Sequence, residues 1–283
     1  MRPSTVLRGL TTKGQVARIR TIDISSLRDA SSPPAMQQAT ANELSSAFGA
    51  DGFAVITGHG VPAATVEALR SAARGFFDGP PEAKDPFDHG KGYGYGGYVR
   101  QGFENGAQLL GDFSRPPDLV ESLTLRGLLQ SAPRAGVSGA ESPSAKPCLG
   151  YGGAHRGGPE VEVLPDAVVG AAQQFALESR GLSCALAEVA RRGLGVSLEE
   201  IDALVDVNAA GCRLAHYPAQ RGGGARAGQL RYGAHVDSGG ITVLSLDPTN
   251  HAGLQVDHAH VHTCAHARAH MDTCNKDKDA WNA

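Results

Sequence analysis

The chain has 283 residues and a formal net charge of -3, from 26 basic and 29 acidic side chains. This length suffices for one large domain or for a core with an N-terminal subdomain. The near balance of charge gives no reason to expect nucleic acid or a membrane surface as the main partner. No apolar run approaches the roughly 20 residues that cross a bilayer, so we expect a soluble protein. The cysteines are odd in number and contain no CxxC pair, which argues against a secreted disulfide framework. They are Cys148, Cys184, Cys212, Cys264 and Cys274.

The first 19 residues form a basic lead-in. Residues 1–22 carry five basic side chains, several serines and threonines, and no acid. This composition fits an organellar transit peptide, but it also fits a short disordered segment before the first strand. We favour the second interpretation and expect a cytoplasmic protein.

The next segment predicts an alternation of strands and helices. Arg20 to Leu27 alternates apolar and polar residues, as a short strand does, and an apolar stripe around Leu44 predicts a helix after it. Phe53 to Ile56 has the composition of a buried strand. A second helix is expected to start at Pro62 and to stop at Gly79, where two prolines follow.

Two glycine-rich segments are expected to be loops. Gly90 to Tyr98 alternates glycine with tyrosine, but no helix follows whose N-terminus could hold a phosphate. We interpret it as a mobile aromatic loop. Residues 131–164 are rich in glycine, proline and serine and have few large apolar side chains, which predicts an exposed insertion.

The second half begins with a long predicted helix from Pro165 to about Arg192, where apolar residues recur at helical spacing. Arg213 to Pro218 and Ile241 to Leu246 have the character of strands. The stretch from Gly222 to Gly228 between them predicts a hairpin loop or a flexible excursion.

His235 and Asp237 lie two residues apart at the entry to the second of these strands. That spacing puts both side chains on one face. An imidazole and a carboxylate side by side are two of the three ligands in the 2-His-1-carboxylate arrangement that binds ferrous iron. Taken alone, the pair also fits a strand that binds no metal.

The residues around this pair resemble the isopenicillin N synthase-like dioxygenases, which use iron and 2-oxoglutarate. In the second half the resemblance rests on Arg213, Tyr217, Pro218, Gly233, His235, Asp237, Gly239, Thr242, Leu244 and the segment from Gly253 to Val256. In the first half it rests on Ile22 to Ile24, Gly52 to Val61, Phe76, Phe77, Pro80, Glu82, Lys84, Gly92, Tyr93 and Asp118 to Ser122. The ordered set runs from about Arg20 to Val256.

The resemblance implies an α+β chain with a double-stranded β-helix, or jelly-roll, core after an α/β N-terminal domain. It implies Fe(II) as cofactor, 2-oxoglutarate as cosubstrate, and a small organic substrate oxidised with molecular oxygen. His235 and Asp237 would be iron ligands, and Tyr217 would help to hold 2-oxoglutarate; alternatively, Tyr217 is a core aromatic. Arg213 shares the strand of Tyr217 at an even offset and could face the same cavity, or it is a structural arginine. His216 should face the opposite side.

The end of the chain departs from the family pattern. A second histidine and an arginine are expected downstream of the pair, and neither is recognisable. Residues 257–283 instead carry closely spaced histidines. These could capture a metal, but alternating His, Thr, Ala, Arg and Cys is also what translated simple-sequence DNA would give. We therefore expect an incomplete jelly-roll core.

The expected organisation has five parts: a lead-in (1–19), an N-terminal dioxygenase-type domain (20–130), the insertion (131–164), a helix with the first part of the core (165–256), and the tail (257–283). Three functions remain open. The chain is a dioxygenase, or it is a catalytically inactive fragment or binding isoform, or it binds metal through its histidine-rich tail.

Overall fold

The computed structural model describes residues 8–10, 16–88, 97–125, 128, 165–194, 211–220, 225–235, 237 and 241–247. The expected insertion, most of the aromatic loop and the histidine-rich tail lie outside these residues. The chain forms two compact units. The first comprises Met1–His59, Ala185–Ser197 and Ser245–Ala283, and the second comprises Gly60–Cys184 and Leu198–Leu244.

The first unit contains two small sheets. β1 (Arg8–Leu10) pairs antiparallel with β2 (Val16–Arg18), inside the segment expected to be a lead-in. β3 (Thr21–Asp23) pairs in parallel with β4 (Val55–Thr57), and Ile22 lies opposite Ile56. This unit therefore has the strand, helix, strand order that the sequence predicts.

The first predicted strand is shorter than expected. It ends at Asp23, whose carboxylate accepts a hydrogen bond of 2.8 Å from the backbone amide of Ser25. This turn redirects the chain into the short helix α1 (Ser25–Arg28), so the second half of the predicted strand is helical. The alternation of apolar residues beyond Asp23 therefore does not mark a strand.

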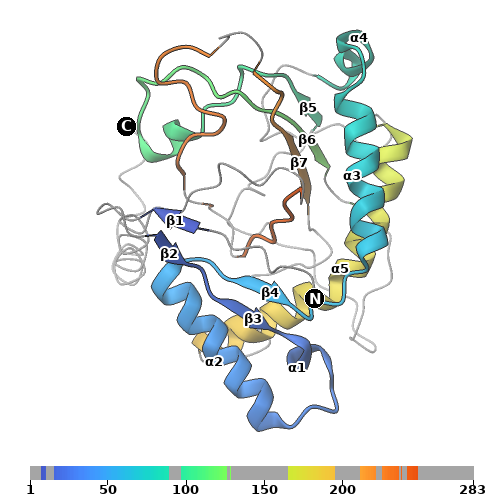
Figure 1. Cartoon of the computed structure of the whole chain (residues 1–283). Helices are drawn as coiled ribbons and strands as arrows, with labels where there is room; N and C mark the ends of the chain where they lie inside the picture. Colours follow the sequence, from blue (N-terminus) through green and yellow to red (C-terminus); the bar gives the residue numbers. More distant parts are fainter. Residues whose placement is uncertain are drawn as a thin grey trace, which may run out of the picture. The chain divides into compact units, whose positions relative to one another are not determined.

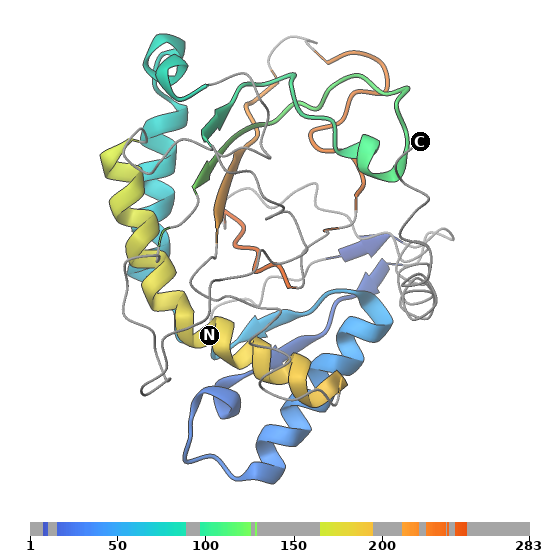
Figure 2. The ribbon, with the colours of Figure 1, turned by 180° about the vertical axis from the view of Figure 1, so that it is seen from behind.

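The long helix of this unit is α2 (Pro34–Asp51). It starts with a proline in the first turn, and the chain leaves it at Gly52, whose φ of 69° is in the left-handed region. Its buried face consists of Ala41, Leu44 and Ala47, spaced by three residues. The C-terminal end of helix α5 (Asp166–Leu194) crosses α2 (Figures 1 and 2), where Arg192 donates hydrogen bonds to two glutamine side chains of α2.

The second unit is built on a three-stranded antiparallel sheet in the order β5-β6-β7. The strands are β5 (Gly97–Val99), β6 (Glu121–Leu125) and β7 (Cys212–His216). Helices α3 (Ala63–Phe77) and α4 (Pro81–Lys84), the 3₁₀ turns Asp85–Phe87 and Gly106–Leu110, and the N-terminal part of α5 complete it. As predicted, Pro62 precedes α3, and Gly79 follows its end.

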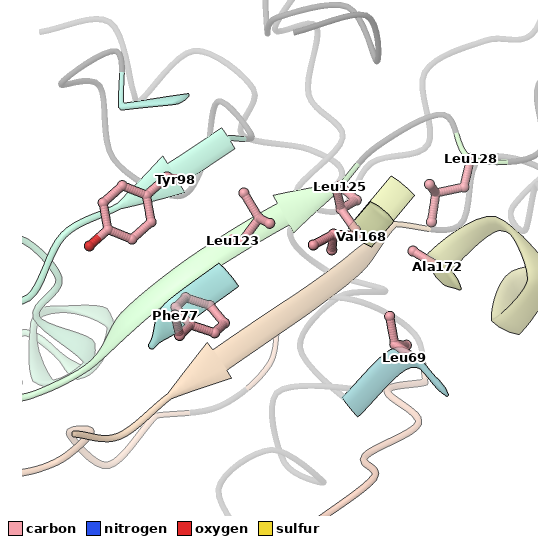
Figure 3. Packing of buried hydrophobic residues seen from close by; sticks show 8 residues of the cluster. All are labelled: Leu69, Phe77, Tyr98, Leu123, Leu125, Leu128, Val168 and Ala172. Atoms are coloured by element: carbon pink, nitrogen blue, oxygen red, sulfur yellow. The ribbon is translucent and has the colours of Figure 1, made fainter. Parts of the chain in front are cut away.

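One face of this sheet packs against the helices, and Figure 3 shows the cluster. Its buried members are Leu69 and Phe77 of α3, Tyr98 of β5, Leu123 and Leu125 of β6, Leu128, and Val168 and Ala172 of α5. Leu123 and Leu125 are fully buried, and each such burial stabilises the fold by about 1.5–3 kcal/mol. The regularly spaced apolar residues that predict α3 and α5 therefore form the helix faces that cover the sheet.

A buried polar cluster lies on the same face. The carboxylate of Glu121 in β6 accepts hydrogen bonds from Lys84 Nζ at 3.0 Å and from the Tyr98 hydroxyl, and pairs with His216 Nδ1 at 2.8 Å. The His216 ring stacks on Phe77 with centroids 5.1 Å apart. His216 thus faces the helices, as the alternation along its strand predicts. Its ring contacts Glu121 and Phe77 there.

Two sequence predictions are wrong within these residues. Tyr98, at the end of the expected aromatic loop, is buried in strand β5, because it pairs with Leu123 of β6 and its hydroxyl bonds to Glu121. The predicted strand from Ile241 to Leu246 is not formed. An alternating pattern becomes a strand only beside a partner, and Val243 and Leu244 remain 46% and 58% exposed.

The expected jelly-roll is seen only in part. The residues described by the structure form mixed helix and sheet, and the three-stranded sheet does not close among them. None of the helices in the described ranges is sufficiently long and apolar to span a bilayer.

Candidate metal centre

The second face of the β5-β6-β7 sheet carries polar side chains. Glu121, Leu123 and Leu125 of β6 point to the helices, so the alternate residues Ser122 and Thr124 point to the other side. Arg213 of β7 lies opposite Thr124 in the ladder and shares that side. We call this the site face, because the segment that contains His235 contacts its residues.

His235 and Asp237 lie next to each other, as their spacing predicts. His235 Nε2 is 3.2 Å from Asp237 Oδ1, and their side chains are 29% and 51% exposed. The other ring nitrogen, Nδ1, donates a hydrogen bond of 2.9 Å to the carbonyl oxygen of Gly233. This bond fixes the tautomer in which Nε2 can bind a metal.

The two side chains also shift each other's pKa values. The hydrogen bond that His235 donates to Asp237 raises the pKa of His235 above its ordinary value, against the opposing effect of burial. The same bond lowers the pKa of Asp237, and the hydroxyl of Thr242 adds to that effect. A metal ion bound at Nε2 would compete with a proton for this nitrogen.

The segment from Leu230 to Gly233 is fixed by the neighbouring backbone. Leu119 donates a backbone hydrogen bond of 2.8 Å to the Leu230 carbonyl. A side chain added at Gly233 would lie 2.4 Å from the backbone nitrogen of Ala107, so only glycine permits this approach. Gly233 is therefore required both for the close packing and for the carbonyl that orients His235.

Arg213 contacts the same segment. Its guanidinium donates a hydrogen bond of 2.6 Å to the carboxylate of Glu104 and lies over the ring of Tyr232, 5.1 Å from the centroid. The Tyr232 ring in turn meets the His235 ring edge to face, with centroids 4.7 Å apart and planes at 90°. The Ser122 hydroxyl donates to the other oxygen of Glu104.

Tyr217 directly follows β7. The guanidinium of Arg231 lies 5.9 Å from its ring centroid, and 37% of the residue is exposed. Burial of the hydroxyl raises the pKa of Tyr217, and the charge of Arg213 acts in the opposite direction. The same charge acts on His235 and Asp237, so Arg213 is the group that these three residues share.

The donor set fits ferrous iron as far as it is described. An imidazole nitrogen and a carboxylate oxygen at 3.2 Å can occupy adjacent positions on one ion, and they leave further positions for other ligands. Within the described ranges, no group of three or more His, Cys, Asp or Glu side chains could hold a metal. Gly239 and the segment from Gly253 to Val256, which carry part of the sequence resemblance, lie outside these ranges.

Sequence reasoning did not identify Glu104 or Tyr232 as part of this site. Glu104 lies in a loop without periodicity, and only the fold brings it to Arg213, 109 positions along the chain. Tyr232 lies three positions before His235. This closeness in sequence to a candidate ligand was the signal that could have identified it.

The chain is similar to known proteins in sequence and in fold. Residues 19–144 match the family described as non-haem dioxygenase in morphine synthesis, N-terminal. The chain is similar to the 2-oxoglutarate-dependent dioxygenase tropC of Talaromyces stipitatus, at 28% identity over 248 residues, which cover 84% of this chain and 69% of that protein.

Solved structures share the fold. A full-length Neurospora crassa protein in complex with alpha-KG matches with a TM-score of 0.52 and 22% identity, over 76% of this chain and 59% of that one. A 2OG-Fe(II) oxygenase family protein from Caulobacter crescentus matches with a TM-score of 0.50 and 20% identity, over 73% of this chain and 58% of its own. The chain thus spans less than two thirds of these two structures. The family match, the sequence relative and the shared fold together support an iron and 2-oxoglutarate-dependent dioxygenase.

Proposed function

We propose that this protein is an Fe(II)- and 2-oxoglutarate-dependent dioxygenase that oxidises a small organic molecule. The observation that carries the proposal is the pairing of His235 Nε2 with Asp237 Oδ1 at 3.2 Å, with the other imidazole nitrogen fixed on a backbone carbonyl. The similarity to 2-oxoglutarate-dependent dioxygenases adds to it, because such enzymes hold ferrous iron with this type of donor.

His235 and Asp237 are the proposed metal ligands. His235 presents Nε2, because its Nδ1 proton is committed to the Gly233 carbonyl. Asp237 supplies an anionic oxygen, which partly neutralises the charge of the ion. Bound Fe(II) with 2-oxoglutarate supplies the activation of oxygen and the oxidation of the substrate. The chain's own residues bind, orient and hold these groups.

Tyr217 is the proposed contact to 2-oxoglutarate. The charges of Arg213 and Arg231, which would favour an anionic partner, act on its hydroxyl together with the opposing charges of Glu104 and Asp118. A hydrogen bond to a carboxylate contributes about 1.5–3 kcal/mol, so Tyr217→Phe should weaken 2-oxoglutarate binding by roughly 10–100-fold. The affinity for the metal alone should stay unchanged, because Tyr217 is not one of the proposed metal ligands.

The deciding experiment is an anaerobic titration of the purified chain with Fe(II) and 2-oxoglutarate, followed by the visible charge-transfer band of the bound chelate. We expect a band in the wild-type chain and its loss in His235→Ala and Asp237→Ala. Asp78→Ala is the matched control, because Asp78 is exposed at the end of α3, and this variant should keep the band.

The same titration separates the alternatives. A band that persists in Asp237→Ala would refute the assignment of this carboxylate. If the wild-type chain gives no band and forms no succinate, it retains the architecture of the family without its chemistry, and the proposed activity is wrong. Once a band is found, succinate formation in the presence of candidate substrates identifies the substrate.

A further inference from the structure

We propose that Glu104 and Arg213 are positioning residues that hold the imidazole of His235 in its ligand orientation, through the ring of Tyr232. The inference rests on the proposed function, because it concerns the metal ligand. It assigns a role to the ion pair of a buried carboxylate and a partly buried guanidinium. The sequence resemblance gives this pair no role.

The first link is the anchoring of Arg213. The side chain of Glu104 is 1% exposed, and its two carboxylate oxygens receive the Ser122 hydroxyl and the Arg213 guanidinium. A carboxylate so far removed from water requires both partners. Arg213 therefore has one favourable position, at 2.6 Å from Glu104 and on the site face of the sheet.

The second link is the stack on the ligand. The Arg213 guanidinium lies 5.1 Å from the centre of the Tyr232 ring, within the range of a cation–π interaction. The Tyr232 ring stands perpendicular to the His235 ring at 4.7 Å, the preferred edge-to-face geometry of aromatic pairs. The Tyr232 ring restricts the rotation of the imidazole, and it thereby preserves the hydrogen bond to Gly233 that fixes the tautomer of His235.

A purely structural role for the pair is the alternative. Buried ion pairs are weak evidence for stability, since apolar residues of similar volume often replace them without loss. The sheet offers a matched comparison on its other face, where Lys84 and Glu121 form a buried pair at 3.0 Å that contacts the helices and no ligand. If both pairs only stabilise the sheet, their disruption should affect the metal centre equally.

The test measures Co(II) affinity by visible absorption in the full-length chain, for Arg213→Met, Glu104→Gln and Tyr232→Leu. Substitutions behind a metal-bound histidine typically weaken binding 10–100-fold, and we expect about tenfold for each variant. Tyr232→Phe keeps the ring and should bind as the wild type does. Lys84→Met should lower thermal stability and leave Co(II) affinity within roughly twofold, because it lies on the opposite face.

A second measurement needs no metal. Long-range ¹H–¹⁵N spectra of the metal-free chain report which nitrogen of His235 carries the proton. We expect one dominant form with a protonated Nδ1 in the wild type, and exchange between tautomers in Arg213→Met and Tyr232→Leu. An unchanged His235 spectrum in both variants would overturn the positioning role, as would equal loss of Co(II) affinity in Lys84→Met.

These readouts separate the two proposals. A wild-type chain that binds no Co(II) would overturn the metal centre, but the spectra of the metal-free chain would still decide whether Arg213 and Tyr232 orient His235. Co(II) binding that is unaffected in Arg213→Met would leave the centre intact and overturn the positioning role.

Discussion

Removal of the Lys84 ammonium should destabilise the protein strongly. Lys84 Nζ lies 3.0 Å from Glu121 and 2.9 Å from the Phe77 carbonyl, and the two charged side chains are 9% and 7% exposed. Deletion of one partner of a buried ion pair costs about 3–5 kcal/mol, because the other charge stays in the interior. Tyr98 and His216 still contact the carboxylate, so we expect about 3 kcal/mol for Lys84→Met, at the lower end of this range.

Urea unfolding followed by circular dichroism measures this loss, with the double variant Lys84→Met/Glu121→Leu as the control. The double variant should regain part of the free energy of unfolding, because it leaves no uncompensated charge. A loss below about 1 kcal/mol for Lys84→Met would refute the reasoning, since it would approach the effect of about 0.5 kcal/mol that is usual for surface substitutions. The reasoning would also be refuted if the double variant lost more free energy of unfolding than the two single variants lose together.

Further predictions concern acid stability and two glycines. Burial raises the pKa of Glu121, but the bonds from His216, Tyr98 and Lys84 outweigh it and leave the pKa below its ordinary value. The ionised Glu121 therefore contributes fully to stability above the unfolded pKa of about 4.3, and this contribution is lost as the pH falls below it. The free energy of unfolding of the wild type should decrease steeply below that pH, and Glu121→Gln should make this decrease shallower. Gly233→Ala forces a methyl group against the Ala107 backbone and should cost about 1–3 kcal/mol in urea unfolding, with weaker Co(II) binding. Gly170→Ala in α5 meets no atom within 4 Å and should instead stabilise by about 1 kcal/mol, with Co(II) binding unchanged.

The helices were predictable because their boundaries are local. Pro62 and Gly79 flank α3, and apolar spacing marks the buried faces of α2 and α5. Strands β5 and β6 were not predicted as strands. β5 has only three residues, and the run in β6 becomes a strand only through pairing with β7, which lies about 90 positions away.

The site follows the same division. The spacing of His235 and Asp237 predicted their proximity, and alternation in β7 predicted that His216 would face away. The contacts of Arg213 were open from sequence, because its partner Glu104 is distant in the chain and carries no motif. Local patterns identified the candidate ligands, whereas long-range contacts identified what orients them.

The segment before His235 is held by contacts between residues more than a hundred positions apart. Leu119 bonds to Leu230, Gln229 to Pro117, and Arg213 to Glu104. Such contacts form only after long loops have closed, so the ligand geometry should appear late in folding. A metal that requires this geometry binds the native chain and not its partly folded forms. Metal added during refolding should therefore shift the equilibrium towards the native state by mass action, without accelerating the early steps.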